Sequence, residues 1–544
     1  MTANNKKQSL LTGALAGSFG VFLSKALGLF YVVPLNSFAG ERNMAFYSIT
    51  YTYYDLLLKV CSAGIPFAIA AMVAKYVSRE DYKTAALVRR LGTSLIMGLS
   101  FVVACVFFLG SRPLAARALG PAATPEDIAS LLTLFRILLL AIVFVPFLSS
   151  VRGFYQGLKR LDIYAASQVL EQFIRVFCIV AFGFLIVRVL HFDSVYAIYM
   201  AIFAAGLAAI LTIVYFLLAA KKEGENFDRL VAAQNGEALP SKRIFNELLS
   251  IGLPYVAVSF IGTAGPLVNA NFFVPYATRV GIDYNIAMKA LGIVQVNCSK
   301  IASIPQVLTL GFSAGLVPYL TESLEQQNQT RLREQLADIF KTVIYILTPV
   351  VLIIAFFASA IYAIMYGGRS LEQGARLLAF YSLVAFTDTV APIFSSVLIT
   401  LRFRRNAIIF LIIAAVVKLI SFFIFVYLFG ELGMIFSTAL SSVIVIVLGL
   451  ILLKRNFQFN VRSLLQVTLR SVISSLCAIL PVVLLNHFLP LNYGNRLMCL
   501  IRFGIEGIVM VMIYVGVSTL LKVPQEVFHM KDLSIKKILG RFRH

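Results

Sequence analysis

The sequence predicts an all-α, polytopic membrane protein with about fourteen transmembrane helices. Of its 544 residues, 60% are hydrophobic and 13% are charged, which leaves too little polar surface to cover a soluble core. Apolar runs of roughly 20 residues, the length of a membrane-crossing helix, recur from one end of the chain to the other. These runs lack the two-residue alternation of barrel strands, so helices are expected to satisfy the backbone in lipid.

Charged and turn-forming residues separate the apolar runs and set the expected helix ends. The expected spans are 10–38, 45–74, 88–110, 128–151, 163–187, 195–220, 246–277, 286–320, 341–366, 377–401, 406–429, 432–453, 465–489 and 497–521. The second span contains Gly64-Ile65-Pro66 and the eighth contains Pro305, so both helices are expected to be interrupted. The run after Lys6 and Lys7 is too long for a signal peptide and is expected to stay in the mature protein.

The distribution of lysine and arginine predicts the orientation. With a cytoplasmic N-terminus, basic clusters fall in the inner loops, near residues 75–90, 152–160, 221–243, 331–341, 402–405 and 454–462, and in the tail after Leu521. Both termini are therefore expected on the cytoplasmic side of the membrane. The net charge of +22 then reflects topology and attraction to anionic lipid head groups, and no nucleic-acid partner is expected.

Two short internal matches suggest a repeat. Ser149-Ser150-Val151 and Ser395-Ser396-Val397 each precede a basic turn and a further helix, and Gly64-Ile65-Pro66 resembles Ile304-Pro305. Repeats with interrupted helices in corresponding positions are typical of secondary transporters, although matches this short also arise by chance. The predicted organisation is an N-lobe of six helices at 1–220, a cytoplasmic linker at 221–245, a pseudo-symmetric six-helix C-lobe at 246–455, two further helices at 456–521 and a basic cytoplasmic tail at 522–544.

Catalytic and cofactor sites are not expected. The six cysteines lie in apolar segments without paired spacing, which predicts neither disulfides nor a metal site; they are Cys61, Cys105, Cys178, Cys298, Cys477 and Cys499. A glycine-rich nucleotide loop is missing, so the expected driving force is the membrane potential or an ion gradient of H+ or Na+. The sequence also lacks the catalytic acid cluster or large hydrophilic loop that a lipid-linked glycosyltransferase would need.

Ionisable side chains at bilayer depth are the candidate functional residues, because each costs about 2.5–3.5 kcal/mol at the membrane centre. Some have an i,i+4 partner that can neutralise them on the same helical face: Asp55/Lys59, Glu171/Arg175 and Arg502/Glu506. Others lie near helix ends, where snorkelling to the head groups is expected: Arg136, Lys418 and Arg470.

Lys25, Lys59 and Lys300 are the cations least explained by such effects. Cations that face a water-filled cavity form a site for an anion, and a phosphate or diphosphate fits this chemistry. Arg279, at the outer end of the seventh span, is either a further phosphate contact or an interfacial anchor. Asp388 is either a proton or cation carrier or a counter-charge to Lys25.

The remaining candidates accompany these cations. Asp55, Glu171 and Arg175 are assigned coupling or counter-charge roles. Tyr51, Tyr53 and Tyr54 form a cluster in the second span that is either an interfacial aromatic belt or a wall contacting sugar or lipid.

Several motifs, in order along the chain, resemble those of the MOP (multidrug/oligosaccharidyl-lipid/polysaccharide) exporter superfamily. Ser24-Lys25-Ala26-Leu27-Gly28 resembles its helix-one signature, and Ala63-Gly64-Ile65-Pro66 its helix-two element. Gly153-Phe154-Tyr155-Gln156-Gly157 resembles the turn after helix four, and Leu316-Val317-Pro318 with Glu322 resembles the end of helix eight. The branch that these motifs resemble most is that of polysaccharide and lipid II flippases (SpoVB/YtgP/MurJ-like).

The resemblance implies an alternating-access bundle with a cationic cavity for the diphosphate of an undecaprenyl-linked cell-wall precursor, moved from the inner to the outer leaflet. Lys25 matches the helix-one arginine, and Lys59 lies where the branch carries an arginine in helix two. Tyr31 replaces a second helix-one arginine, and Asn269 and Asn271 stand where an acid is expected. These departures leave a teichoic-acid or other polysaccharide repeat open as the substrate.

Two other functions compete with this interpretation. A cation-coupled multidrug antiporter of the same superfamily needs acids in its cavity, whereas the candidates here are mostly basic. A structural membrane scaffold would leave the buried lysines without a purpose. The expected partners are therefore a lipid-linked oligosaccharide, anionic membrane lipids and the cell-wall synthesis machinery.

Overall fold

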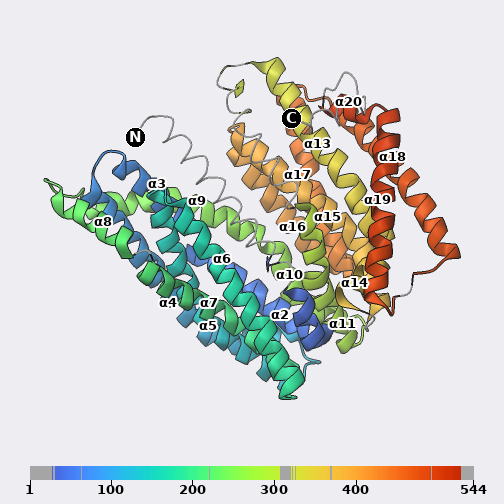
Figure 1. Ribbon diagram of the computed structural model, residues 1–544, viewed down its shortest axis with the longest axis horizontal. Helices are drawn as coiled ribbons and strands as arrows, with labels where there is room; N and C mark the ends of the chain where they lie inside the picture. Colours follow the sequence, from blue (N-terminus) through green and yellow to red (C-terminus); the bar gives the residue numbers. More distant parts are fainter. Residues whose placement is uncertain are drawn as a thin grey trace. The chain divides into compact units, whose positions relative to one another are not determined.

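The protein was analysed as a computed structural model, which describes residues 27–28, 31–62, 64–219, 221–306, 320, 323–324, 326, 328–367, 370–491 and 493–528 (Figure 1). The described residues are helical with short connections and contain no β-strand, so the predicted fold class is confirmed. The chain divides into two compact units, residues 1–292 and 293–544.

The first unit consists of long helices with two π-helical turns after α6. Its elements are α2 (Val32–Ser62), α3 (Ile65–Val77), α4 (Tyr82–Leu119), α5 (Pro125–Gly157), α6 (Leu161–Phe177), η1 (Cys178–Phe182), η2 (Leu185–Val189), α7 (Val195–Ala219), α8 (Lys221–Ala233), α9 (Ser241–Gly262), α10 (Ala264–Arg279) and α11 (Tyr284–Gly292). Helix α5 lies at the centre of this unit, where it packs against α2, α3, α4 and α7.

The second unit also consists mainly of long helices. Its elements are η3 (Ile293–Cys298), α13 (Gln329–Phe356), α14 (Ala358–Tyr366), α15 (Leu371–Thr400), α16 (Arg404–Phe429), η4 (Gly430–Leu432), α17 (Gly433–Phe457), α18 (Val461–Phe488), α19 (Arg496–Leu520) and α20 (Val523–Phe528). Helices α13, α15 and α17 share an apolar core that includes Phe340 stacked on Phe394.

Within the described residues, ten helical segments are long and apolar enough to cross a membrane. The segment Arg404–Phe457 contains two of the predicted spans, joined by the short turn η4. The exact number of fourteen spans stays a prediction. The predicted lobes and their internal symmetry also stay a prediction. The boundary between the two compact units lies between Gly292 and Ile293, and the predicted 221–245 linker contains helix α8.

The predicted interruption at Gly64–Pro66 is confirmed, whereas the one at Pro305 stays a prediction, because residues 307–319 lie outside the described part of the chain. Gly40 adopts φ 76° and ψ 159°, a conformation that favours glycine, and kinks α2 between the first two predicted spans. The chain breaks again after Ser62, and α3 starts with Pro66 in its first turn, where the missing N–H costs nothing. The predicted seventh span is also interrupted, because α9 ends and α10 begins around Thr263.

Two glycines of the 153–157 motif allow α5 to lie directly against α3. A Cβ atom at position 153 would be 2.5 Å from the carbonyl oxygen of Pro66, and one at Gly157 would be 2.8 Å from the carbonyl oxygen of Ala70. Only glycine permits so close a contact between helix backbones. The motif near Pro66 and the motif at 153–157, which are far apart in sequence, are therefore two halves of one helix contact.

We expect Gly153→Ala to lower the free energy of unfolding by about 1–3 kcal/mol, because the added methyl group must push a backbone carbonyl away. The measurement is the thermal unfolding midpoint of the purified protein in detergent. Gly504→Ala on α19 is the control, since a Cβ there has nothing within 4 Å. Equal midpoints for parent and Gly153→Ala would contradict the close packing of α3 and α5.

A single carboxylate on α20 ties this helix to two others of the second unit, α13 and α18. Glu526 accepts hydrogen bonds from Lys341 of α13 at 2.8 Å and from Ser463 and Arg470 of α18 at 3.1 and 3.2 Å. Burial raises the pKa of Glu526, but the hydrogen bond and charge of Lys341 outweigh it, and Ser463 and Arg470 add to the effect, so the pKa lies below its ordinary value. The ionised form is therefore the one that the folded protein favours.

We expect Glu526→Gln to cost about 1–2 kcal/mol of stability at neutral pH, from the weakened charge-assisted hydrogen bonds. Because the pKa is lower in the folded state, this contribution is complete above the unfolded pKa and disappears as pH falls below about 4.5, the ordinary glutamate value. Unfolding midpoints of parent and variant, measured from pH 7 to pH 3.5, should converge at the acid end. A constant difference across this range would rule out the charge as its cause.

Candidate functional site

The candidate site in the first unit starts from one face of α2. Tyr47, Tyr51, Tyr54, Asp55 and Lys59 recur at spacings of three and four residues, so they lie along the same side of the helix. We call these five residues the α2 stripe. Lys59 lies in the last turn of the α2 helix, where a cation also interacts favourably with the helix dipole.

The predicted Asp55/Lys59 pair is confirmed. The Lys59 ammonium donates to Asp55 at 2.6 Å and to the hydroxyl of Thr263 at 3.2 Å, where α9 gives way to α10. Lys59 is thus not the unpaired cation that the sequence suggested, and Asp55 is its counter-charge. The two side chains keep 33% and 44% of their surface exposed, so the pair is open to solvent or to a ligand.

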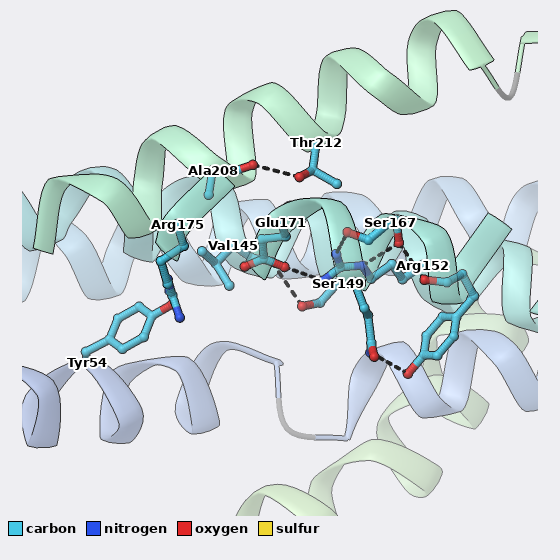
Figure 2. A network of polar contacts seen from close by, with 11 residues as sticks. Tyr54, Val145, Ser149, Arg152, Ser167, Glu171, Arg175, Ala208 and Thr212 are labelled. Carbon is cyan, nitrogen blue, oxygen red and sulfur yellow. Dashed lines mark hydrogen bonds and ion pairs between the residues drawn. The ribbon is translucent and has the colours of Figure 1, made fainter. Parts of the chain in front are cut away.

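The other predicted pair of the first unit, Glu171/Arg175, does not form. Glu171 instead accepts from Arg152 of α5 at 2.6 Å, and these two side chains point toward each other in Figure 2. Arg152 also donates to the hydroxyl and the backbone carbonyl of Ser167, at 2.9 and 2.8 Å. The prediction was wrong because Arg152 belongs to a different helix, and sequence spacing shows only partners on the same helix.

Arg175 turns to α2 instead. It donates to the Tyr54 hydroxyl at 3.0 Å, as Figure 2 shows, while its Nε is buried without a hydrogen-bond partner. Tyr47, Tyr51 and Tyr54 are in ring contact with one another along the stripe, and Tyr47 also shares a hydrogen bond of 2.7 Å with Tyr31. Arg175 thus meets this row of tyrosines at Tyr54, whereas Tyr53 of the predicted cluster makes its ring contacts with Phe107 and Phe135. The choice between an interfacial belt and a wall for sugar or lipid stays a prediction.

These tyrosines and Arg175 line a small cavity closed by Ala201, Ile202 and Ala205 of α7. Its volume of about 10 Å³ is enough for roughly one water molecule. A ligand would therefore meet the α2 stripe at its exposed end, at Asp55 and Lys59, in this conformation.

The second unit contains a separate charged cluster. Lys418 of α16 is only 1% exposed and donates to the carbonyl of Met434 and to the hydroxyls of Ser437 and Thr438, at 3.1, 2.8 and 2.7 Å. The expected snorkelling of Lys418 is wrong, because the first two turns of α17 supply all three oxygens. Asp388 of α15 accepts from Ser442 of the same α17 at 2.5 Å and attracts Lys418 electrostatically.

The other predicted phosphate contacts are Lys25, Lys300 and Arg279. Lys25 lies outside the described residues. Arg279 is an exposed residue at the end of α10, and Lys300 is a partly buried helical residue of the second unit that makes interactions of its own. Their assignment to a diphosphate stays a prediction.

Some of the remaining predictions for charged residues are confirmed and others are not. The Arg502/Glu506 pair is confirmed at 2.9 Å. Arg136 is exposed beside the ring of Phe108, as snorkelling requires, whereas Arg470 pairs with Glu526. Asn271, one of the two asparagines standing where an acid was expected, accepts from Tyr53 at 2.5 Å.

The Asp55/Lys59 and Arg152/Glu171 ion pairs differ in how easily they open. An exposed i,i+4 pair such as Asp55/Lys59 contributes about 0–1 kcal/mol. Breaking a buried pair by removing one partner costs about 3–5 kcal/mol, and Arg152 and Glu171 are only 11% and 15% exposed. Lys59 can thus exchange Asp55 for an incoming anion at little cost, whereas Arg152 stays bound to Glu171.

Comparisons with known proteins agree with this arrangement of a polytopic helical protein. The chain is 29% identical over 473 residues to "Lipid II flippase MurJ" of Bacillus subtilis (strain 168), covering 86% of each chain. It is 23% identical over 390 residues to "Stage V sporulation protein B" of the same organism, covering 70% of this chain and 71% of the relative.

Solved structures show the same fold. A lipid II flippase MurJ in an inward closed conformation has a TM-score of 0.66 at 16% identity and covers 93% of this chain and 99% of its own. An inward-facing MATE transporter of the MOP superfamily has a TM-score of 0.63 at 15% identity and covers 79% and 94%. The sequence profile of the lipid II flippase MurJ family matches residues 68–504. By this match over most of its length, the chain belongs to the lipid II flippase MurJ family.

Proposed function

We propose that this protein moves lipid II, an undecaprenyl-diphosphate-linked cell-wall precursor, from the inner to the outer leaflet of the bacterial cytoplasmic membrane by alternating access. The family match over residues 68–504 is the observation that carries the proposal. The role is transport without covalent chemistry, and the basic inner loops favour a topology with both termini in the cytoplasm.

Lys59 is the proposed contact for the diphosphate. Its side chain is partly exposed, and its pairing with Asp55 contributes little, so the doubly charged diphosphate can replace Asp55 as the partner. The hydroxyl of Thr263 remains beside the ammonium as a further hydrogen-bonding group. Lys25, Lys300 and Arg279 stay proposed as additional phosphate contacts.

The tyrosines of the α2 stripe lead away from Lys59 and are proposed to contact a sugar or lipid chain in a more open conformation, because an aromatic ring offers an apolar face with a polar tip. Arg175 holds these rings in place through Tyr54. In the second unit, Asp388 is the proposed coupling residue for H+ or Na+, since it is a carboxylate inside a membrane-spanning helix with Lys418 nearby.

The experiment is to express the chain in bacteria whose own lipid II flippase is depleted and to measure growth and cell shape. Rescue by the parent chain is expected. Failure to rescue, with normal amounts of folded protein in the membrane, would favour another lipid-linked polysaccharide or a teichoic-acid repeat as the substrate. Parallel depletion of flippases for those polymers would identify which one it is.

A further inference from the structure

A second and larger cavity lies in the first unit, away from the α2 stripe. Its volume is about 720 Å³, within the range of roughly 300–1,000 Å³ that small-molecule sites occupy. The first turns of α4 and the last turns of α5 form its walls, and Val231 of α8 and Ala238 of the following segment also line it.

The wall from α4 is strongly basic. Lys83, Arg89 and Arg90 line the cavity together with the hydroxyl-bearing residues Thr93 and Ser94. Lys83 donates to the carbonyl of Gly236 at 2.8 Å, which leaves its charge uncompensated there, and Arg90 is exposed. Cations and hydroxyls gathered in one cavity are the groups that bind a phosphate.

Arg89 is held in a fixed orientation. Its guanidinium lies 4.8 Å from the ring centre of Phe154 and 5.6 Å from that of Phe227, and cation–π contacts of this kind restrict the side chain. The nearest carboxylate contact is with Asp228 at 3.5 Å, and that residue is 64% exposed, so it neutralises the arginine weakly.

The α5 wall is apolar. Phe147, Val151, Phe154 and Tyr155 line it. The cavity thus joins a cationic side to an aromatic and aliphatic side, which matches a ligand that carries a phosphate on an apolar body.

Hydrogen bonds fasten the segment after α8, which contributes Ala238 to the cavity lining, to the start of α4. Gln234 accepts from the backbone N–H of Lys83 at 2.8 Å and donates to Asp81 at 3.1 Å. The backbone N–H of Leu239 donates to Thr84 at 3.0 Å. Phe227 of α8 packs its ring on Phe154 of α5 and so fixes α8 beside the cavity.

The length of α4 places the basic wall at head-group depth. The helix has 38 residues, whereas about 20 are enough to cross the hydrocarbon core. Its polar residues gather at its two ends, from Tyr82 to Ser94 and from Ser111 to Arg117. The first end therefore extends into the head-group region, while the mainly apolar stretch between them crosses the membrane. By the orientation proposed above, this is the cytoplasmic leaflet.

We infer that the cavity between α4, α5 and α8 is a binding site for the phosphate head group of a membrane lipid, with the lipid chain against the aromatic wall of α5. Acidic phospholipids and polyprenyl phosphates share this chemistry. The site is separate from the Lys59 contact, so it does not depend on which glycan the protein carries.

The test is native mass spectrometry of the purified full chain in detergent, supplied with dioleoyl phosphatidylglycerol or with dioleoyl phosphatidylcholine. The parent should retain one phosphatidylglycerol and little phosphatidylcholine, which has the same chains without net charge. Lys83→Gln/Arg90→Gln should lower the affinity for phosphatidylglycerol at least about tenfold. Arg79→Gln/Lys159→Gln is the matched control, because it removes two exposed charges from turns on the same side that do not line the cavity.

Ala86→Phe provides a second variant that fills the cavity and keeps every cation, so it should also displace the lipid. Competition with undecaprenyl phosphate separates the two sources: displacement of phosphatidylglycerol assigns the site to the carrier lipid, and its persistence assigns the site to phospholipid. Equal retention of phosphatidylglycerol by the parent, the cavity variants and the control would overturn the inference, as would equal retention of phosphatidylcholine.

Discussion

Lys59→Gln should abolish rescue of flippase-depleted cells, whereas Asp55→Asn should preserve it. Loss of one charge-assisted contact to the diphosphate is worth about 1.5–3 kcal/mol, a roughly tenfold to hundredfold loss of affinity. Asp55→Asn removes only the group that competes with the diphosphate for Lys59, and the exposed pair contributes little to stability. The measurement is colony formation after depletion, with membrane levels of each variant determined in parallel.

Opposite outcomes for Lys59→Gln and Asp55→Asn distinguish a substrate contact from a structural ion pair. If the pair were only structural, both variants would fail or both would succeed. Lys221→Gln and Glu225→Gln provide the control. These residues form an exposed i,i+4 lysine–glutamate pair on α8, with 3.9 Å between the ammonium and the carboxylate, and they are not part of the α2 stripe. Both control variants are expected to rescue.

Arg152→Ala should lower the free energy of unfolding by about 3–5 kcal/mol, the usual cost of removing one partner from a buried ion pair. The variant leaves the carboxylate of Glu171 buried and also breaks two hydrogen bonds to Ser167. Thermal unfolding in detergent should show a clearly lower midpoint and less folded protein in the membrane.

The matched comparison is Arg152→Met/Glu171→Met, which removes both charges and keeps apolar volume in their place. We expect this double variant to be more stable than Arg152→Ala, because no charge is left buried without a partner. A double variant as unstable as the single one would show that Glu171 is not held by Arg152.

Much of the fold could be predicted because the membrane restricts the chain to helices. Gly64 and Pro66 predicted the helix interruption between α2 and α3. The i,i+4 spacing correctly predicted two of three proposed ion pairs, Asp55/Lys59 and Arg502/Glu506. The 153–157 motif was identified as a signature, but its physical reason, the contact with Pro66 and Ala70, depends on two helices lying together.

The site was harder to predict for the same reason. The pairing of Arg152 with Glu171 and the burial of Lys418 against α17 are contacts between helices, and no spacing within one helix indicates them. The sequence does not indicate a role for Thr263, because a threonine inside a predicted apolar span is common. Its position beside Lys59 is known only from the structure.

The most direct measurement is the fraction of newly made lipid II that reaches the outer face of cells depending on this chain for growth, determined by its accessibility to an added enzyme. With the parent chain and with Asp55→Asn, most of the precursor should become accessible. With Lys59→Gln, it should accumulate on the inner face. Precursor that reaches the outer face equally in all three strains would contradict the role of Lys59, and precursor that remains inside with the parent chain would contradict the proposed transport.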